Sequence, residues 1–384
     1  SGTMTLTSGD GANGGTSLGT ADGAAGGAGG LLTVEAFDQA ANLTIIAGSG
    51  GIGGAVSGTS HNGGVGGAGG GVTVDASASP ITGAVTVTGG TGGVGGAGGG
   101  NTKRGGHGGI GGVIAVAHQD GDVGTNISLT GGAGGNGGNA TLSGSTGGNG
   151  GAGSTISYEV DGNVGGTIFL DDGAAGSVGS AVTGGTAGSG GAAGTVTLLL
   201  DGSTVTGATT VGDDGDGTIT TKTGAVTFSN EIGTAAKALG TMDVDIATTF
   251  HKNVYADAFT AAAVNVIFTG TTEQVVSGRM TGTGTLSVEA DAIVNMTHTG
   301  SAHTVDALTL AADAQTSLTL NDKLIVTTDN GMTIGAASNI VLGSGIVDGE
   351  TAIEATHANG VQVAAALTLK MPESFNSGTI TFCE

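Results

Sequence analysis

A unit of about 40 residues recurs five times in the first half of the chain, and each copy joins short apolar strands to runs of glycine. One strand pattern leads into the glycine, as in NLTIIAGSGGIGG at 42–54, and a second follows it, as in GVTVDA at 71–76. The first pattern begins at Thr3, Asn42, Ala84, Asn126 and Gly166, and the second at Leu31, Gly71, Gly112, Ser154 and Thr195. Two patterns that keep one period indicate an array in which each copy packs against the next.

Within the glycine runs, a residue other than glycine returns at every third position, as at Thr91, Val94 and Ala97. This is the period of polyproline II, a conformation without internal hydrogen bonds. A single glycine arm therefore gains nothing by ordering, whereas arms lying side by side can approach closely and form hydrogen bonds between their backbones. We expect polyglycine-II arms that fold only as a stack.

The alternative is a disordered linker, which glycine-rich composition without a period usually indicates. The period, the flanking strands and the lack of proline and serine runs favour the ordered array. The GGxGGxGG runs between short strands resemble the polyglycine-II arrays of phage tail-fibre adhesins and of glycine-rich bacterial surface proteins, over about Thr3 to Gly194. In such adhesins the loops at the arm ends bind receptors. This resemblance would give recognition to the tips at 57–62, 101–104 and 140–146, and solvent exposure is the alternative reading of these tips.

Beyond about residue 218 the glycine content falls and short alternating strands follow one another closely, such as AVNVIFTG and TLSVEA. Such strands indicate a sandwich, a barrel or a solenoid. The stretch Asn265 to Ala292 resembles the strand repeats of autotransporter-like and haemagglutinin-like bacterial surface proteins, and the resemblance covers most of Ala225 to Leu342. It implies a secreted parallel β-helix.

We therefore expect an all-β protein, a repeat array of short strands and polyglycine-II helices followed by a β-solenoid or β-sandwich. The expected domains are glycine-rich repeats at 1–200, an acidic connector at 201–220 and a strand-rich solenoid-like domain at 221–384.

The charge of the chain excludes several partners. Acidic residues number 31 against 8 Lys and Arg, the net charge is −23, and there is no Trp and only two Tyr. Nucleic acid binding needs basic and aromatic residues in number, so nucleic acid is not expected as a partner. No apolar run approaches the roughly 18 residues of a membrane span. The one cysteine, Cys383, excludes an intrachain disulfide.

The acidic segment VGDDGDGTI is the best candidate for a metal site. An EF-hand-like calcium loop needs oxygen ligands at its positions 1, 3 and 5. Asp214 and Asp216 fit positions 3 and 5, with Asp213 beside them, but Gly212 then occupies position 1. Calcium is the candidate ion here, an acidic turn is the alternative, and no other cofactor is expected.

No enzyme activity is expected. The seven histidines, among them His298 and His303, lack the spacing of a metal site, and we expect them at the surface or in turns. GxSxG, HExxH and P-loop patterns are absent, and the GxGxxG matches in the arms lack a surrounding βαβ unit.

The strands near the two ends of the sequence suggest self-assembly. A strand without a neighbour on one side exposes unpaired backbone and invites another chain. The candidate contact residues are Thr3, Met4, Thr5, Leu6, Thr379, Ile380, Thr381 and Phe382. We expect an extracellular or cell-surface structural protein whose copies pair head to tail in a filament or coat. The alternatives are an adhesin that binds a cell-surface or glycan receptor through its arm tips and an ice-binding protein, in which flat glycine arrays and threonine-bearing strands present a regular surface.

Overall fold

All secondary structure in the described part of the chain is β-strand, and no helix occurs there. The computed structural model describes residues 2–18, 21–34, 41–58, 60–75, 80–100, 103–117, 121–327, 331–346, 352–355, 361–363 and 368–370. The chain forms two compact units, one of Ser1–Asp161 with Phe169–Leu198 and one of Gly162–Ile168 with Leu199–Glu384.

In the first unit, equivalent strands of successive repeats stack in parallel columns. One column has the order β1-β3-β6-β9-β11, and the second has the order β2-β5-β8-β10-β12. Thr3 of β1 pairs with Asn42 of β3, so one repeat makes one coil of the stack. The strands are Thr3–Thr7 (β1), Leu31–Val34 (β2), Asn42–Ile46 (β3), Ser60–His61 (β4), Gly71–Asp75 (β5), Val85–Thr88 (β6), Gly99–Gly100 (β7), Val113–Ala117 (β8), Ile127–Thr130 (β9), Thr155–Asp161 (β10), Ile168–Asp171 (β11) and Thr195–Asp201 (β12).

The alternation of side chains places the core inside these coils. In β3, Leu43 and Ile45 are fully buried, while Thr44 between them is half-buried. A third side of the coil is marked by the parallel bridge between Ile81 and Val123, both fully buried. The coil that contains Ile81 is therefore closed on three sides around branched apolar side chains, and the alternation within its strands is the one that the period of two predicts.

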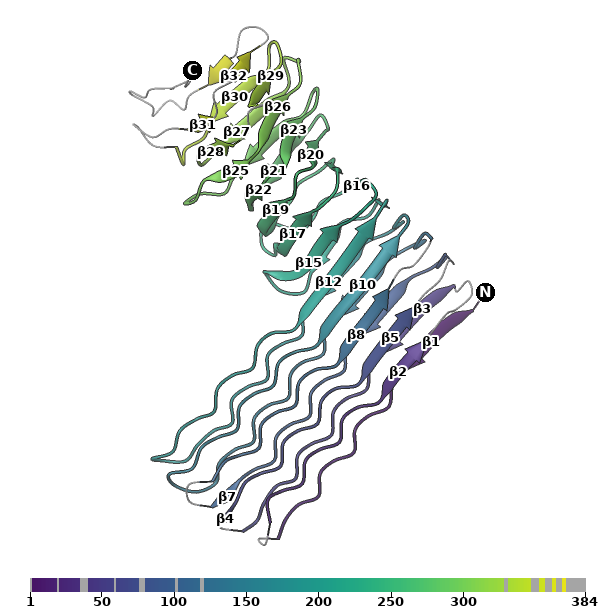
Figure 1. Cartoon of the computed structure of the whole chain (residues 1–384), viewed down its shortest axis with the longest axis vertical. Helices are drawn as coiled ribbons and strands as arrows, with labels where there is room; N and C mark the ends of the chain where they lie inside the picture. The colour runs from purple at the N-terminus through teal and green to yellow at the C-terminus, as the bar shows by residue number, and fades with distance from the viewer. Residues whose placement is uncertain are drawn as a thin grey trace. The chain divides into compact units, whose positions relative to one another are not determined.

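Between the two columns, each coil extends a pair of glycine arms (Figure 1). We call the segments after the first column outgoing arms and those before the second column returning arms. The outgoing arms span 8–17, 47–56, 89–98, 131–140 and 172–181, and the returning arms span 22–30, 62–70, 104–112, 146–154 and 186–194. The arms contain almost no strand, so their cohesion must come from hydrogen bonds of another pattern.

That pattern repeats every three residues. In the outgoing arm 89–98, the amide of Gly92 donates to the carbonyl of Ala133 in the next outgoing arm (2.8 Å), and we call this triplet position lateral. The amide of Gly93 donates to Gly67 of a returning arm (2.8 Å), and we call this position cross. The third position of each triplet, such as Val94, faces outward and we call it outer. Backbone bonds in two directions thus replace a side-chain core in the arms.

Glycine is required at interior positions such as Gly92 and Gly93 because the backbones approach too closely for a side chain. A Cβ on Gly92 would overlap the carbonyl oxygen of Gly109, and a Cβ on Gly93 would overlap that of Gly51. The expectation that arms order as a hydrogen-bonded stack is thus explained by their geometry, and the assignment of their conformation to polyglycine II stays a prediction.

In its described residues, the second unit consists of strand coils without arms. Its sheet orders are β15-β17-β19-β22, β13-β16-β18-β20-β23-β26-β29-β32, β21-β24-β27-β30-β33 and β25-β28-β31. The strands are Thr204–Val205 (β13), Thr209–Val211 (β14), Asp216–Thr221 (β15), Val226–Phe228 (β16), Leu239–Val244 (β17), Thr248–Phe250 (β18), Ala256–Ala261 (β19), Asn265–Phe268 (β20), Glu273–Val276 (β21), Arg279–Gly282 (β22), Thr285–Val288 (β23), Ile293–Met296 (β24), His303–Val305 (β25), Ala307–Leu310 (β26), Ser317–Leu320 (β27), Leu324–Val326 (β28), Met332–Ile334 (β29), Asn339–Leu342 (β30), Ile353–Ala355 (β31), Val361–Val363 (β32) and Thr368–Lys370 (β33).

A stack of phenylalanine rings forms part of the core of the second unit. The ring centroids of Phe228 and Phe250 lie 5.4 Å apart and those of Phe250 and Phe268 lie 5.3 Å apart. All three side chains are buried, and equivalent residues of adjacent parallel strands bring them together. The all-β class and the solenoid-like stacking of parallel strands are thus confirmed. Among the described residues, no helix is long and apolar enough to cross a membrane.

Candidate functional site

The first candidate site is the open edge of the strand columns at β1. Thr3, Met4, Thr5 and Leu6 lie in this strand, which pairs in parallel with β3 and, within the described chain, with no other strand. Leu6 is buried, Met4 is half-buried, and Thr3 and Thr5 are exposed. The strand is therefore anchored through its apolar side chains, and no pairing of its backbone on the other side is described.

The adjacent edge strand β2 has the same property. It pairs only with β5 in the described structure. Its first residue, Leu31, exposes 77% of its surface. Neither β1 (TMTLT) nor β2 (LLTV) contains a charged residue or a proline, the devices that usually protect an edge strand from pairing with another chain. Two unprotected edges of one coil together make a surface suited to strand addition. Thr379, Ile380, Thr381 and Phe382, the other predicted contact residues, lie outside the described residues, as does Cys383.

The second candidate site, the acidic segment after β14, is a tight turn into β15. The carboxylate of Asp216 accepts a hydrogen bond of 2.6 Å from the amide of Asp213. Asp214 accepts one of 2.8 Å from the amide of Ala238, and Asp213 lies 3.7 Å from the ammonium group of Lys237.

The three carboxylates therefore each have a protein partner. No group of three or more His, Cys, Asp or Glu side chains suited to a metal ion occurs among the described residues. Calcium binding at this turn stays a prediction. The turn joins the same two strand columns that carry the arms in the first unit.

Of the two neighbouring histidines, His303 is placed differently from the expected surface or turn position. His303 is fully buried, and its Nδ1 accepts a hydrogen bond of 3.1 Å from the amide of Met280. Its ring packs edge-on against His298, with centroids 5.8 Å apart. Burial lowers the pKa of His303 to about 4, with His298 acting in the same direction. The expectation of a surface or turn histidine is wrong for His303, which begins β25 with its side chain turned into the coil.

A set of side chains that sequence reasoning missed lies on the outer positions of the arms. The amide of an outer residue points away from the lattice, and an Asn, Asp or His one repeat earlier accepts its hydrogen bond. The donor and acceptor pairs are Ser49 to Asp10, Ile52 to Asn13, Asn62 to Asp22, Arg104 to Asn62, Asn149 to His107, Ser177 to Asn136, Ser180 to Asn139 and Ser189 to Asn149. The recurrence of Asn or Asp at outer positions is the sequence signal that identifies them.

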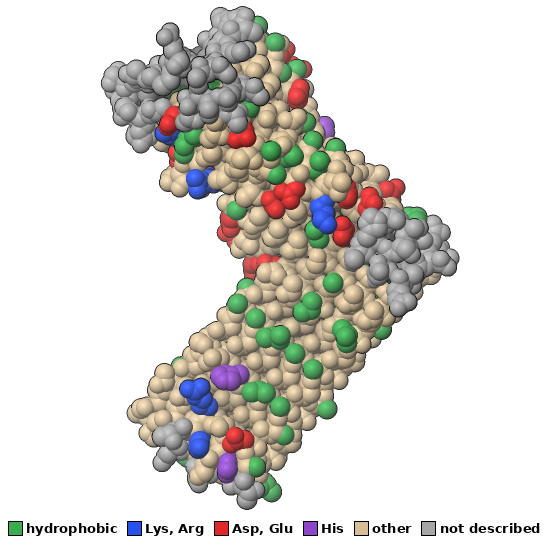
Figure 2. Space-filling view, in the orientation of Figure 1, with side chains coloured by type: hydrophobic (Ala, Val, Ile, Leu, Met, Phe, Trp, Pro, Cys, Tyr) green, Lys and Arg blue, Asp and Glu red, His purple; other side chains and the backbone are tan. Residues whose placement is uncertain are grey.

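The arm tips are tied to one another. His61 in β4 pairs in antiparallel fashion with Gly99 in β7, one repeat later. The ring of His61 lies 3.4 Å from the carboxylate of Asp22, and hydrogen bonds from Asn62 lower the pKa of that carboxyl group. Figure 2 shows Lys and Arg side chains gathered with histidines on this part of the first unit. The cationic residues of the third tip are Lys103 and Arg104.

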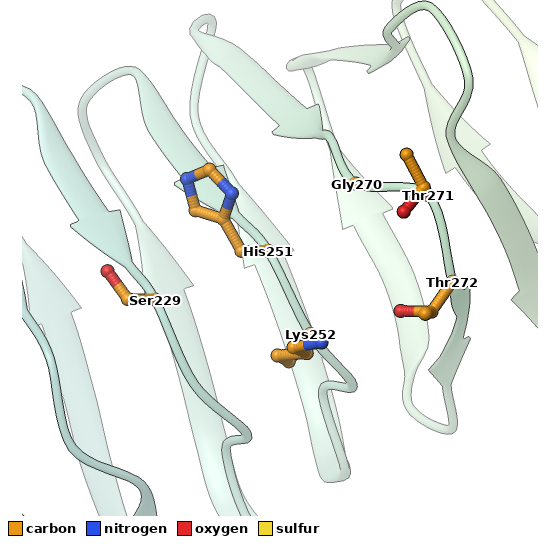
Figure 3. Close-up of a pocket in the computed structure, with 6 residues that line it drawn as sticks. All are labelled: Ser229, His251, Lys252, Gly270, Thr271 and Thr272. Atoms are coloured by element: carbon orange, nitrogen blue, oxygen red, sulfur yellow. The ribbon is translucent and has the colours of Figure 1, made fainter.

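A shallow pocket lies on the second unit. Figure 3 shows its lining residues, which follow three successive strands, β16, β18 and β20. They are Ser229, His251, Lys252, Gly270, Thr271 and Thr272. The lining includes no carboxylate that could orient His251 as a base, so the pocket does not indicate acid–base chemistry.

The fold and the open edges define an all-β, β-solenoid-like protein with parallel stacked strands. No model of a known protein family matches the chain, and no curated protein matches it. Among solved structures, the chain is similar to a springtail antifreeze protein from Granisotoma rainieri, a bundle of nine polyproline type II helices. The identity is 28%, over 49% of this chain and 93% of that one, with a TM-score of 0.19. At this TM-score the match assigns neither a fold nor a function to this chain.

Proposed function

We propose that this protein is a structural subunit that assembles head to tail, outside the cell or on its surface, into a filament or coat. The observation that carries the proposal is the pair of adjacent edge strands, β1 and β2, without charge or proline. Such an edge offers a row of backbone donors and acceptors to an added strand. When two copies meet through different faces, each new copy leaves a face free for the next one. A filament then grows along one axis, unless the rotation between neighbouring copies closes the assembly into a ring.

The occupant of the edge is a second copy of this chain. The pairs of β1 with β3 and of β2 with β5 are parallel, so an added copy in the same orientation continues the pattern without a change of register. The segment around Thr379 to Phe382 is the proposed source of the added strand. The net charge of −23 makes like subunits repel, so assembly should strengthen as salt screens that charge.

The test is assembly of the full chain, followed by analytical ultracentrifugation and negative-stain electron microscopy over a range of protein and salt concentrations. We expect oligomers whose length increases with protein concentration and with salt concentration. Thr5→Pro removes an amide donor from β1 and should abolish assembly, whereas the control Thr5→Val keeps the backbone and should assemble normally. The melting temperature of each variant shows whether the monomer is folded. Dispersed monomers of the wild type under every condition would refute the proposal.

A second candidate function is adhesion through the arm tips, and the cationic tip supports it. Lys103 and Arg104 lie in one tip of a chain with only 8 Lys and Arg, and His61 lies in the paired tip one repeat earlier. This combination suits an anionic receptor group, such as an acidic glycan. Lys103→Ser with Arg104→Ser should abolish retention on an acidic-glycan surface and leave assembly unchanged. Equal retention of variant and wild type would exclude this role.

A further inference from the structure

At the two edges of the glycine array, some positions that are glycine in the interior arms are alanine. At the cross positions, repeats two to five contain glycine, with the exception of Ser154 at the end of one arm. In the first repeat the cross positions include Ala12 in the outgoing arm and Ala24 in the returning arm. Alanine therefore occurs at cross positions only in the first repeat, for which no preceding arm is described.

The direction of these methyl groups follows from the equivalent glycines one repeat later. A Cβ on Gly51 would overlap the carbonyl oxygen of Ala12, and a Cβ on Gly64 would overlap that of Ala24. A cross side chain thus points at the preceding arm of the same layer. The methyl groups of Ala12 and Ala24 occupy the places that the carbonyl groups of another pair of arms would need.

At the opposite edge, two lateral positions of the last returning arm have side chains. The first four returning arms contain only glycine there, and a Cβ on Gly147 or Gly153 would overlap the carbonyl oxygen of Gly179 or Gly173 in the next outgoing arm. The equivalent residues of the fifth returning arm are Ala187 and Ala193, both exposed. A sixth outgoing arm would meet their methyl groups.

The last pair of arms shows what side chains do to the lattice. Its outgoing arm carries Ala175 and Val178 at lateral positions. The bonds from Gly188 and Gly191 of the returning arm to this outgoing arm are 3.2 and 3.1 Å, whereas the equivalent bonds from Gly148 and Gly151 in the preceding repeat are both 2.8 Å. The longer bonds occur beside Ala175 and Val178, whereas the third bond of this pair, from Gly194 to Gly173, measures 2.5 Å.

We infer that the methyl groups at the two edges of the glycine array weaken the packing of further arms there, whereas strands can add at β1 and β2, so the partner that adds there is a coil without arms. This inference rests on the proposed function and names its partner surface. In this chain the second unit supplies such coils. There the connection between the corresponding columns is short, with two residues between β21 and β22 and three between β27 and β28. The arms of one copy would then project beside the junction without touching arms of the next.

The test uses hydrogen exchange read by mass spectrometry on the full chain, at concentrations below and above assembly. We expect the amides of β1 and β2 to exchange at least tenfold more slowly in the assembled state. Amides of the first outgoing arm at Gly9, Ala12 and Gly15 should exchange at the same rate in both states. If the amides of this arm also exchange more slowly in the assembled state, the arms of one copy stack on the arms of another. That result would overturn the inference, although the proposed assembly itself would be supported.

A variant provides an independent measurement. Gly9 and Gly15 have no atom within 4 Å of an added Cβ, so Gly9→Ala with Gly15→Ala should fold and should assemble as the wild type does. In an arm-to-arm junction the same methyl groups would collide with the partner, and loss of assembly in this folded variant would refute the inference. If neither state shows slower exchange at any site, the proposed function fails instead.

Discussion

The side-chain oxygen of Asn136 accepts a hydrogen bond of 2.9 Å from the backbone amide of Ser177, in the outgoing arm of the next repeat. Asn139 does the same for Ser180 at 2.9 Å. The outer residue of a triplet cannot use its amide within the backbone lattice, and an exposed amide would otherwise bond only to water. Successive arms are thus joined by side-chain hydrogen bonds on the outer surface, in addition to the backbone hydrogen bonds of the glycines.

Removal of these acceptors should loosen the outer surface without unfolding the arms. In the double variant Asn136→Ala with Asn139→Ala, we expect the amides of Ser177 and Ser180 to exchange about tenfold faster. The loss of stability should stay below about 1 kcal/mol per bond, because the amides gain water as a partner. Hydrogen exchange measures the effect, and the amide of Ser189, bonded to Asn149, is the internal control. Unchanged exchange at Ser177 would contradict this role.

The requirement for glycine should depend on position within the lattice. Gly93→Ala places a methyl group against the carbonyl of Gly51, so we expect a loss of more than about 3 kcal/mol or failure to fold. Gly15→Ala meets no atom within 4 Å and should be neutral or stabilising by about 0.4–1 kcal/mol, since alanine restricts the unfolded chain. Thermal melting of both variants checks the contrast. Equal effects would show that the backbones do not approach as described.

Burial of His303 should make stability depend on pH. Its pKa is about 4 in the folded chain and about 6.5 when unfolded, so the unfolded state binds more protons between these values. Stability from the neutral ring is fully present above about pH 6.5 and is lost as the pH falls to about 4. The loss amounts to about 3 kcal/mol at most.

Urea denaturation between pH 4 and pH 7 measures this dependence. In His303→Gln the same pH range should change stability less, while His251→Gln should retain the wild-type dependence. If wild type and His303→Gln show identical pH dependence, the buried neutral ring is not its source.

The phenylalanine stack should dominate the core of the second unit. Phe250 lies between Phe228 and Phe268, so Phe250→Ala opens a cavity and removes two ring contacts, and we expect a loss of about 3–5 kcal/mol. Phe250→Leu fills most of the volume and should cost less than half as much. Chemical denaturation compares the two. A small effect of the alanine variant would show that the stack is not a structural core.

The sequence predicts the coils well because their signal is local. Alternation at Leu43 and Ile45 identifies a strand with one buried face, and the common period of two strand patterns places equivalent strands side by side. The spacing of Thr91, Val94 and Ala97 likewise predicts the triplet period of the arms, although not the direction in which the third residue faces. These features depend on near neighbours in the chain or on exact repetition, and both are visible in a single sequence.

The remaining features depend on which parts of the chain meet. The difference between Gly15, where a side chain has room, and Gly54, where it does not, comes from a neighbouring arm about 40 residues away. Asp214 fits a calcium pattern by spacing, yet its carboxylate faces the amide of Ala238. The burial of His303 depends on how its turn enters β25. The contacts of Asp214 and His303 leave no periodic mark in the sequence.

The two units should respond differently to cold. The glycine arms bury main chain and few apolar side chains, so their unfolding exposes little hydrocarbon and carries a small heat-capacity change. The coils of the second unit, built on phenylalanine and branched aliphatic residues, depend on a hydrophobic contribution that weakens as the temperature falls. The arms should therefore stay folded over a broader temperature range than the coils of the second unit. On cooling to near 0 °C, the free energy of unfolding of the arms should fall less than that of the packed core.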